Sequence, residues 1–413
     1  MPVQLHPVDE IINVQWEGGT AFLYSGADGM FGSEDGEKWV KAEAAVPAIS
    51  LACIDGVWIA CNPFEATWRS EDGAVTWKAV AGFKFEEVAA MRPKGTDAEG
   101  NPMPGVFAGW LMEDDNHVVY TSHDLGETWS IALSIPTSIP FGDNENGYER
   151  IQGLSGCGES AGFFVCTIKG DSRYANGDGM IYTSLDGNSF IRQLVFGPGT
   201  NFIPGPPGQP TPELRGFTAL AVAYDTKSNS YIAIGAKQTR SSSTAPVGIV
   251  TSHMIYTIGS GSSFSQSEGT IAASAQIMNG FGDFLQVDNT AAGGKGLFIG
   301  GFGRNPFEAG QLQGEGTTHA IIIPGNSQQT MENRIVTSFC FKPALDSADE
   351  GSADESLEDG TFACVSYDNG GSGGAYIRTD GFFRKTHSGR SIGGLGAVAV
   401  GTVDFLGEDE SAP

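Results

Sequence analysis

Basic residues are scarce in this sequence. Its 413 residues include 23 Lys and Arg against 49 Asp and Glu, which gives a formal net charge of −26 at pH 7. An acidic field of this size repels phosphate backbones, and no local basic patch interrupts it along the chain. We therefore exclude nucleic acid as a partner.

Long apolar runs are absent as well. No stretch reaches the roughly 18 consecutive apolar residues that a membrane span requires, so the sequence predicts no membrane insertion. The N-terminal segment MPVQLHPVDE has neither a basic stretch nor an apolar core. It therefore does not resemble a secretory signal peptide.

Cysteine is sparse, and no C-x-x-C pair indicates a zinc site. The six cysteines are Cys53, Cys61, Cys157, Cys166, Cys340 and Cys364. If the Asp-Gly pair after Ile54 forms a tight turn, Cys53 lies opposite Trp58. Cys61 then faces Ser50, and the two thiols point to opposite faces because side chains alternate along a strand. Such a pair cannot form a disulfide, so we expect buried free thiols.

The sequence does contain a recurring corner. Four segments share a Ser-x-Asp start, a glycine and a terminal aromatic residue, namely SEDGEKW, SEDGAVTW, SHDLGETW and SLDGNSF. The shared positions are Ser33, Asp35, Gly36 and Trp39; Ser70, Asp72, Gly73 and Trp77; Ser122, Asp124, Gly126 and Trp129; and Ser184, Asp186, Gly187 and Phe190. A weak copy at residues 256–264 has Ser260 at the aspartate position, and another, YIRTDGFF, carries Asp380 and Gly381.

Local chemistry accounts for this corner. Ser and Asp side chains accept hydrogen bonds from backbone N–H groups two or three residues further on, which closes a tight turn. The glycine supplies a positive φ, and the aromatic residue begins the next strand and packs into the core. We therefore assign the corner residues a structural role and not a catalytic one.

The corner resembles the Asp-box, or BNR, repeat (S-x-D-x-G-x-T-W), which occurs in β-propellers of the sialidase type and in many non-enzymatic propellers. The clear copies cover the chain to about residue 195, and the weak copies extend the resemblance to about residue 390. The resemblance implies a β-propeller of the sialidase-type superfamily, and the chemistry considered below indicates a non-catalytic member.

Four strand-like pieces per repeat are typical of a propeller blade. We expect an all-β fold, a single β-propeller domain over residues 1–413 with four-stranded antiparallel blades. Seven blades are favoured and six are the alternative. The expected blades are 11–42, 47–81, 85–133, 148–196, 215–268, 281–334 and 335–387, of which the sixth lacks a corner.

Three further segments have distinct compositions. A Pro-rich insertion spans residues 196–216, and an acidic loop spans residues 346–360. Strands rich in small residues, at 219–224 and 396–401, are expected nearest the propeller axis. The C-terminal segment 391–407 predicts one more strand, which would pair with the first blade and close the ring.

The sequence lacks the constellations of several enzymes. The sialidase resemblance would imply an arginine triad, an acid/base Asp and a Tyr–Glu pair. No arginine precedes Arg69, however, and the segment Tyr148-Glu149-Arg150-Ile151 has the wrong order and no Pro. Another glycosidase would need only two carboxylates about 5–9 Å apart, which 49 acidic residues leave open.

Metal and nucleophile signals are weak too. The histidines are scattered, at His6, His117, His123, His253, His319 and His387. The acidic segments 112–117 and 143–149 do not match a calcium-binding loop, and no nucleophile elbow lies between a strand and a helix. We expect no enzyme activity, no cofactor and no bound metal.

These features predict a non-enzymatic structural or interaction propeller. A virion protein is released by lysis and needs no export signal, so we favour a phage-type virion component of the tail, neck or capsid that mediates assembly or host attachment. Its expected partners are other proteins of a large assembly and a glycan on a host surface. The alternatives are a carbohydrate-active propeller (a glycan-binding protein or a glycosidase) and a cytoplasmic cellular assembly factor.

Overall fold

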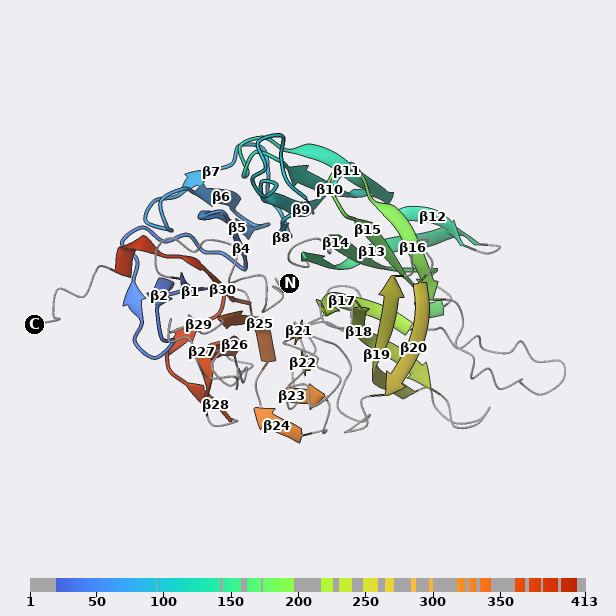
Figure 1. Cartoon of the computed structure of the whole chain (residues 1–413). Helices are drawn as coiled ribbons and strands as arrows, with labels where there is room; N and C mark the ends of the chain where they lie inside the picture. Colours follow the sequence, from blue (N-terminus) through green and yellow to red (C-terminus); the bar gives the residue numbers. More distant parts are fainter. Residues whose placement is uncertain are drawn as a thin grey trace, which may run out of the picture.

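The computed structural model is a ring of antiparallel sheets around a central axis (Figure 1). It describes residues 20–93, 95–141, 144–156, 162–171, 174–196, 217–225, 230–239, 248–258, 264–270, 284–286, 297–299, 318–323, 327–331, 335–342, 361–367, 371–379, 382–392 and 395–406. Among these residues the helical structure is one short 3-10 segment, η2 (Asp404–Leu406). The expected all-β propeller fold is confirmed.

Three sheets are formed by strands from the first third of the chain, together with the C-terminal strand β30. The first contains β3 (Val40–Lys41), β2 (Gly29–Ser33), β1 (Thr20–Gly26) and β30 (Ala397–Thr402). The second contains β4 (Ser50–Ile54), β5 (Val57–Asn62), β6 (Ala66–Ser70) and β7 (Lys78–Ala79). The third contains β8 (Glu87–Met91), β9 (Val106–Glu113), β10 (Asn116–Ser122) and β11 (Ser130–Pro136).

The remaining described strands form four more sheets. The fourth has five strands, β12 (Ser138–Phe141), β13 (Asn144–Gly156), β14 (Phe163–Asp171), β15 (Tyr174–Ser184) and β16 (Ile191–Phe196). The fifth contains β17 (Phe217–Asp225), β18 (Ser230–Thr239), β19 (Gly248–Ile258) and β20 (Phe264–Thr270). The sixth contains β21 (Phe284–Gln286), β22 (Leu297–Ile299), β23 (Thr318–Ile323) and β24 (Ser327–Met331). The last contains β25 (Ile335–Lys342), β26 (Thr361–Tyr367), β27 (Ser372–Thr379), β28 (Phe382–Lys385) and β29 (Gly389–Arg390).

One strand of each sheet lies nearest the axis, and these inner strands contact one another in cyclic order. β30 contacts β4, and the contacts continue through β8, β13, β17, β21 and β25 back to β30. The inner strands β4, β8 and β30 are rich in Ala and Val and almost entirely buried. Small side chains are needed there because the sheets converge and larger ones would collide. The predicted number of blades for the whole chain stays a prediction.

The C-terminal strand closes the ring. β30 pairs antiparallel with β1, with Ala399 opposite Leu23. Two further hydrogen bonds join this strand and the segment after it to the second sheet. Trp58 Nε1 donates to the Thr402 carbonyl at 2.6 Å, and the Asp404 N–H donates to the Gly73 carbonyl at 2.9 Å. The expected closure by residues 391–407 is therefore confirmed.

The predicted register around the first cysteine pair is also confirmed. Cys53 lies opposite Trp58 and Cys61 opposite Ser50, and both thiols are free and buried. Burial raises the pKa of Cys53 to about 12, so its thiol stays protonated at neutral pH. Cys340 is a third free and buried thiol. The side chains of Cys157, Cys166 and Cys364 lie outside the described residues.

The expected start of the fourth blade was wrong. That sheet begins at β12, ten residues before residue 148, because β13 is long enough to pair with β12 through its first residues and with β14 through the rest. Most of the Pro-rich insertion and the whole of the acidic loop 346–360 lie outside the described residues.

We predict that Gly401→Val destabilises the closed ring. A Cβ at Gly401 would lie 2.5 Å from both Cys53 Sγ and Trp58 Cζ2, so a larger residue must push the second sheet away from β30. Overpacking of this kind costs about 1–3 kcal/mol of unfolding free energy, measurable by urea denaturation. The neighbouring change Thr402→Val serves as the control. Equal stability of the two variants would contradict the closure geometry.

Candidate functional site

The four repeated segments form equivalent corners, which we name Ser–Asp corners (33–39, 70–77, 122–129 and 184–190). In each corner the serine Oγ donates to an aspartate oxygen, at 3.1, 2.8, 2.7 and 3.3 Å in chain order. The same Oγ accepts a backbone N–H, from Gly36, Ala74, Gly126 and Gly187 respectively. One hydroxyl therefore supports both the carboxylate and the turn. Asp380 and Gly381 of the weak copy lie outside the described residues.

The corners come in two lengths. In the seven-residue corners the aspartate accepts an N–H two residues on, from Glu37 to Asp35 and from Asn188 to Asp186. In the eight-residue corners it accepts both the N–H and the hydroxyl of a threonine four residues on, Thr76 and Thr128. The expected spacing of two or three residues therefore fails for the long corners, because their turns contain one residue more.

The structure corrects the assignment of one corner glycine. Ala74 (φ 64°) donates its N–H to Ser70 Oγ, as Gly126 (φ 87°) donates to Ser122 Oγ. Gly73 (φ 61°) instead takes the place of Leu125 (φ 56°). Each long corner thus needs two successive residues with positive φ, and glycine fills a different one in each.

The terminal aromatic residues join the corners to the core. Trp39 and Trp129 donate their indole N–H groups to the Gly36 and Gly126 carbonyls, whereas the Trp77 indole N–H has no partner among the described residues. Each of the four aromatic rings packs against a different group of buried apolar residues. This packing agrees with the role expected for the last residue of the repeat.

The corners also contact the preceding sheet, a role that the sequence analysis missed. A Cβ added at a corner glycine would touch a side chain of that sheet or the segment after it: Ile377 at Gly36, Asp404 at Gly73, Ile59 at Gly126 and Val106 at Gly187. Glycine is therefore required for close approach as well as for backbone conformation. The corner is both a hairpin turn and a contact between sheets.

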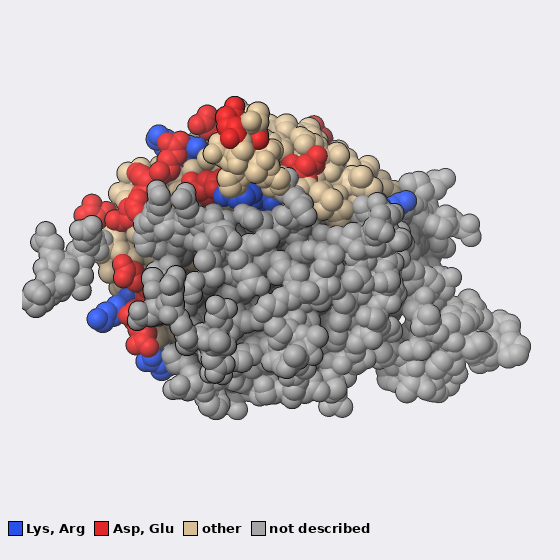
Figure 2. Space-filling model, viewed as in Figure 1, with Lys and Arg blue, Asp and Glu red and all other residues tan. Residues whose placement is uncertain are grey.

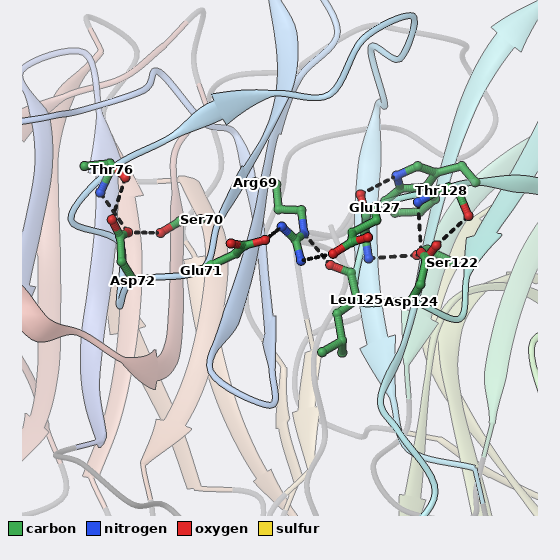
Figure 3. Close-up of polar contacts among 12 residues, drawn as sticks. Arg69, Ser70, Glu71, Asp72, Thr76, Ser122, Asp124, Leu125, Glu127 and Thr128 are labelled. Atoms are coloured by element: carbon green, nitrogen blue, oxygen red, sulfur yellow. Dashed lines mark hydrogen bonds and ion pairs between the residues drawn. The ribbon is translucent and has the colours of Figure 1, made fainter.

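Arg69 links two of the corners (Figure 3). Its Nε donates to the Leu125 carbonyl at 2.6 Å, while Nη1 pairs with Glu71 and Nη2 lies 3.8 Å from Glu127. Leu125 and Glu127 belong to the third sheet, so the guanidinium spans the boundary between the second and third sheets.

The corner carboxylates have lowered pKa values. For Asp72 and Asp124, burial would raise the pKa, but hydrogen bonds from the threonine and serine of the same corner outweigh it. For Asp186 the hydrogen bond from Asn188 is the largest cause of the lower pKa. All three are therefore ionised at neutral pH.

Buried charged groups elsewhere also join sheets. Arg92 pairs with Asp55 of the second sheet and donates to the Met103 carbonyl at 2.6 Å. Glu87 Oε2 accepts the Trp110 indole N–H at 3.1 Å and the Leu154 N–H of the fourth sheet at 2.8 Å. The sequence analysis missed these residues. Glu87 at the start of the apolar strand β8 and Arg92 just after its end were the signals that could have found them.

A Tyr–Glu pair is present, but it is enclosed within the fourth sheet. The Tyr182 hydroxyl donates to Glu149 Oε1 at 2.8 Å, and Thr167 donates to the same oxygen at 2.9 Å. The Glu149 side chain is 6% exposed, and burial raises the pKa of Tyr182. This arrangement binds three strands of one sheet together. Its Glu149 belongs to the segment 148–151 considered in the sequence, but the tyrosine that donates to it is Tyr182 of β15.

The second and third sheets carry their Ser–Asp corners at one edge, and an open groove lies at the other edge. We name it the rim groove, and it encloses about 630 Å³. Its walls come from the β5–β6 connection, the β7–β8 connection, the end of β9, and Tyr120 of β10. The lining includes Glu65, Phe83, Lys84 and Glu113, so aromatic, acidic and basic groups share one concave surface.

The described residues were also compared with the requirements of a metal site and of a membrane-spanning helix, and they meet neither. No group of three or more His, Cys, Asp or Glu side chains gathers there in a way that could hold a metal ion. The described part of the chain also has no helix long and apolar enough to cross a membrane.

His117 is buried beside Trp110, and burial lowers its pKa to about 4.

Comparison with known proteins gives structural likenesses only. No protein-family description and no curated protein matches the sequence. Among solved structures, a mutant of AofleA from Arthrobotrys oligospora is similar at 9% identity and a TM-score of 0.42, covering 98% of this chain and 99% of that one. YCF48 from Cyanidioschyzon merolae is similar at 13% identity, with coverage of 82% and 86% and a TM-score of 0.38. The GH93 alpha-L-arabinofuranosidase of Fusarium graminearum, in complex with arabinobiose, is similar at 10% identity, with coverage of 87% and 92% and a TM-score of 0.38.

The corner carboxylates predict a specific pH dependence of stability. Because the pKa of Asp72 is lowered on folding, its contribution is present above the ordinary value of about 4 and is lost as pH falls through the folded pKa. We expect Asp72→Asn to lower the unfolding free energy by about 1 kcal/mol at pH 7, with the difference from the parent chain shrinking in acid. Urea titrations between pH 3 and pH 7 measure this, with the exposed Glu99→Gln as the control. A difference that is constant across this range would contradict the assignment.

The contact between Gly126 and Ile59 of the preceding sheet predicts that a smaller residue at position 59 partly restores the stability lost when Gly126 is replaced. Gly126→Ala places a Cβ 2.6 Å from Ile59 Cδ1 at a φ of 87°, so we expect a loss of about 2–3 kcal/mol. Ile59→Val removes that methyl group and should restore part of the loss in the double variant. A double-mutant cycle measured by thermal or urea unfolding gives the coupling. Strictly additive effects would show that the corner does not press on the second sheet.

Proposed function

We propose that this chain is a non-enzymatic, Asp-box-type β-propeller that serves as a binding component of a larger protein assembly. The observation that carries the proposal is how its buried and half-buried charged groups are used. Arg69, Arg92 and Glu87 each bind a group on a neighbouring sheet, and Glu149 binds two side chains within its own sheet. These groups stabilise the packing of the strands and sheets, and the rim groove supplies a binding surface on this rigid scaffold.

We propose a phage-type virion component of the tail, neck or capsid that mediates assembly or host attachment, located in the virion. A cytoplasmic cellular assembly factor is the alternative. Both would bind other proteins through exposed loops.

The test is to identify what binds the native protein. Mass spectrometry of purified virions, or of complexes pulled down with the full chain from its source, is expected to recover a stoichiometric set of partner proteins. Electron microscopy of the recovered particle then places the chain. Isolation of the chain alone from both virions and cells would overturn the assembly proposal.

A second candidate is a carbohydrate-active propeller, and the rim groove is the observation that favours it. Phe83 and Tyr120 offer ring faces for sugar stacking, and Glu65 and Glu113 could accept hydroxyl hydrogen bonds. A glycan array and a panel of fluorogenic glycosides test it directly. Turnover that is lost in Glu113→Gln but kept in Glu99→Gln would overturn the non-enzymatic proposal.

A further inference from the structure

The rim groove has a rigid aromatic floor. The Phe83 ring lies 5.1 Å from the Tyr120 ring in an edge-on arrangement and 5.2 Å from Phe85 in a stacked one. Trp129, at 6.0 Å, packs behind it. Because Phe85 is fully buried, the floor is anchored in the core and presents a preformed surface. Such surfaces attract cations and apolar groups with little loss of conformational entropy.

Acidic groups reach the groove from three separate elements. Glu65 comes from the β5–β6 connection, Glu86 from the β7–β8 connection, and Glu113 from the end of β9, whereas Lys84 is the basic residue in the lining. The Tyr120 hydroxyl donates to Glu113, which orients this carboxylate beside the aromatic floor. The lining therefore carries more negative than positive charge.

The edge of the groove is apolar. Phe64, between two lining residues, is 83% exposed, and the lining residue Met112 is 57% exposed. Large exposed apolar side chains beside a concave surface are typical of protein-binding sites. On the face shown in Figure 2, Asp and Glu side chains follow the outer edge of the described sheets, with single Lys and Arg residues among them. An acidic surface of this kind raises the association rate of a basic partner.

We propose that the rim groove binds a basic, apolar-flanked peptide segment of a partner protein. An arginine of that segment lies over Phe83 and Tyr120 and pairs with Glu65 and Glu113, while apolar neighbours contact Phe64 and Met112. This inference rests on the proposed binding function. A peptide is favoured over a glycan because an arginine compensates the excess negative charge of the lining, whereas a neutral sugar offers only neutral hydroxyl donors and an acidic sugar is repelled.

The experiment uses the full chain and a defined probe, the peptide acetyl-Leu-Arg-Leu-Arg-Leu-amide, in isothermal titration calorimetry. We expect saturable binding that weakens with added salt and falls about tenfold when citrulline replaces arginine. The variant Glu65→Gln/Glu113→Gln should lose about tenfold in affinity as well. Its matched control, Glu43→Gln/Glu99→Gln, removes two exposed charges outside the groove and should bind like the parent chain.

A second measurement places the probe on the molecule. With methyl-labelled methionine, the Met112 signal, assigned by its loss in Met112→Leu, should shift during the titration. Absence of binding, equal loss in both double variants, or an unmoved Met112 signal would overturn the inference. Binding of a neutral glycan that is abolished in Glu65→Gln/Glu113→Gln would overturn it too. If native partners still co-purify with that variant, the inference fails while the proposed function stands.

Discussion

The structure depends on the hydrogen bonds of one serine hydroxyl in each Ser–Asp corner. That hydroxyl donates to the aspartate and accepts a backbone N–H, so these hydrogen bonds of the turn are made within the corner. Because these bonds fix the conformation of the turn, the next strand begins with the aromatic side chain of the corner packed into the core. A local interaction among nearby residues therefore sets the direction of a whole strand.

The same corners also hold the sheets against one another. A glycine with positive φ leaves room for a side chain of the preceding sheet, and Arg69 crosses from one corner to the next. Similar contacts support the closure by β30, since Trp58 and Gly73 of the second sheet bind Thr402 at the end of β30 and Asp404 just after it. Hydrogen bonds between neighbouring sheets therefore stabilise the ring in addition to apolar packing.

The two edges of the described sheets differ in chemistry. At the corner edge, charged groups are used in turns and in ties between sheets. At the opposite edge, the rim groove keeps Glu65 and Glu113 exposed beside Phe83. Rigid sheets with one open, chemically mixed surface suit binding, because the surface needs little reorganisation when a partner arrives.

The sequence by itself determined the features that depend on neighbouring residues. The corners, the alternation that separates Cys53 from Cys61, and the closing strand all follow from spacing and turn chemistry over a few residues. Only the tertiary structure decided which distant groups meet. Glu87 with Leu154, Arg69 with Leu125, and Gly126 with Ile59 each join two sheets. No local pattern encodes those partners, because they depend on how the sheets are stacked around the axis. For the same reason the rim groove, built from connections of two sheets, was not visible in the sequence.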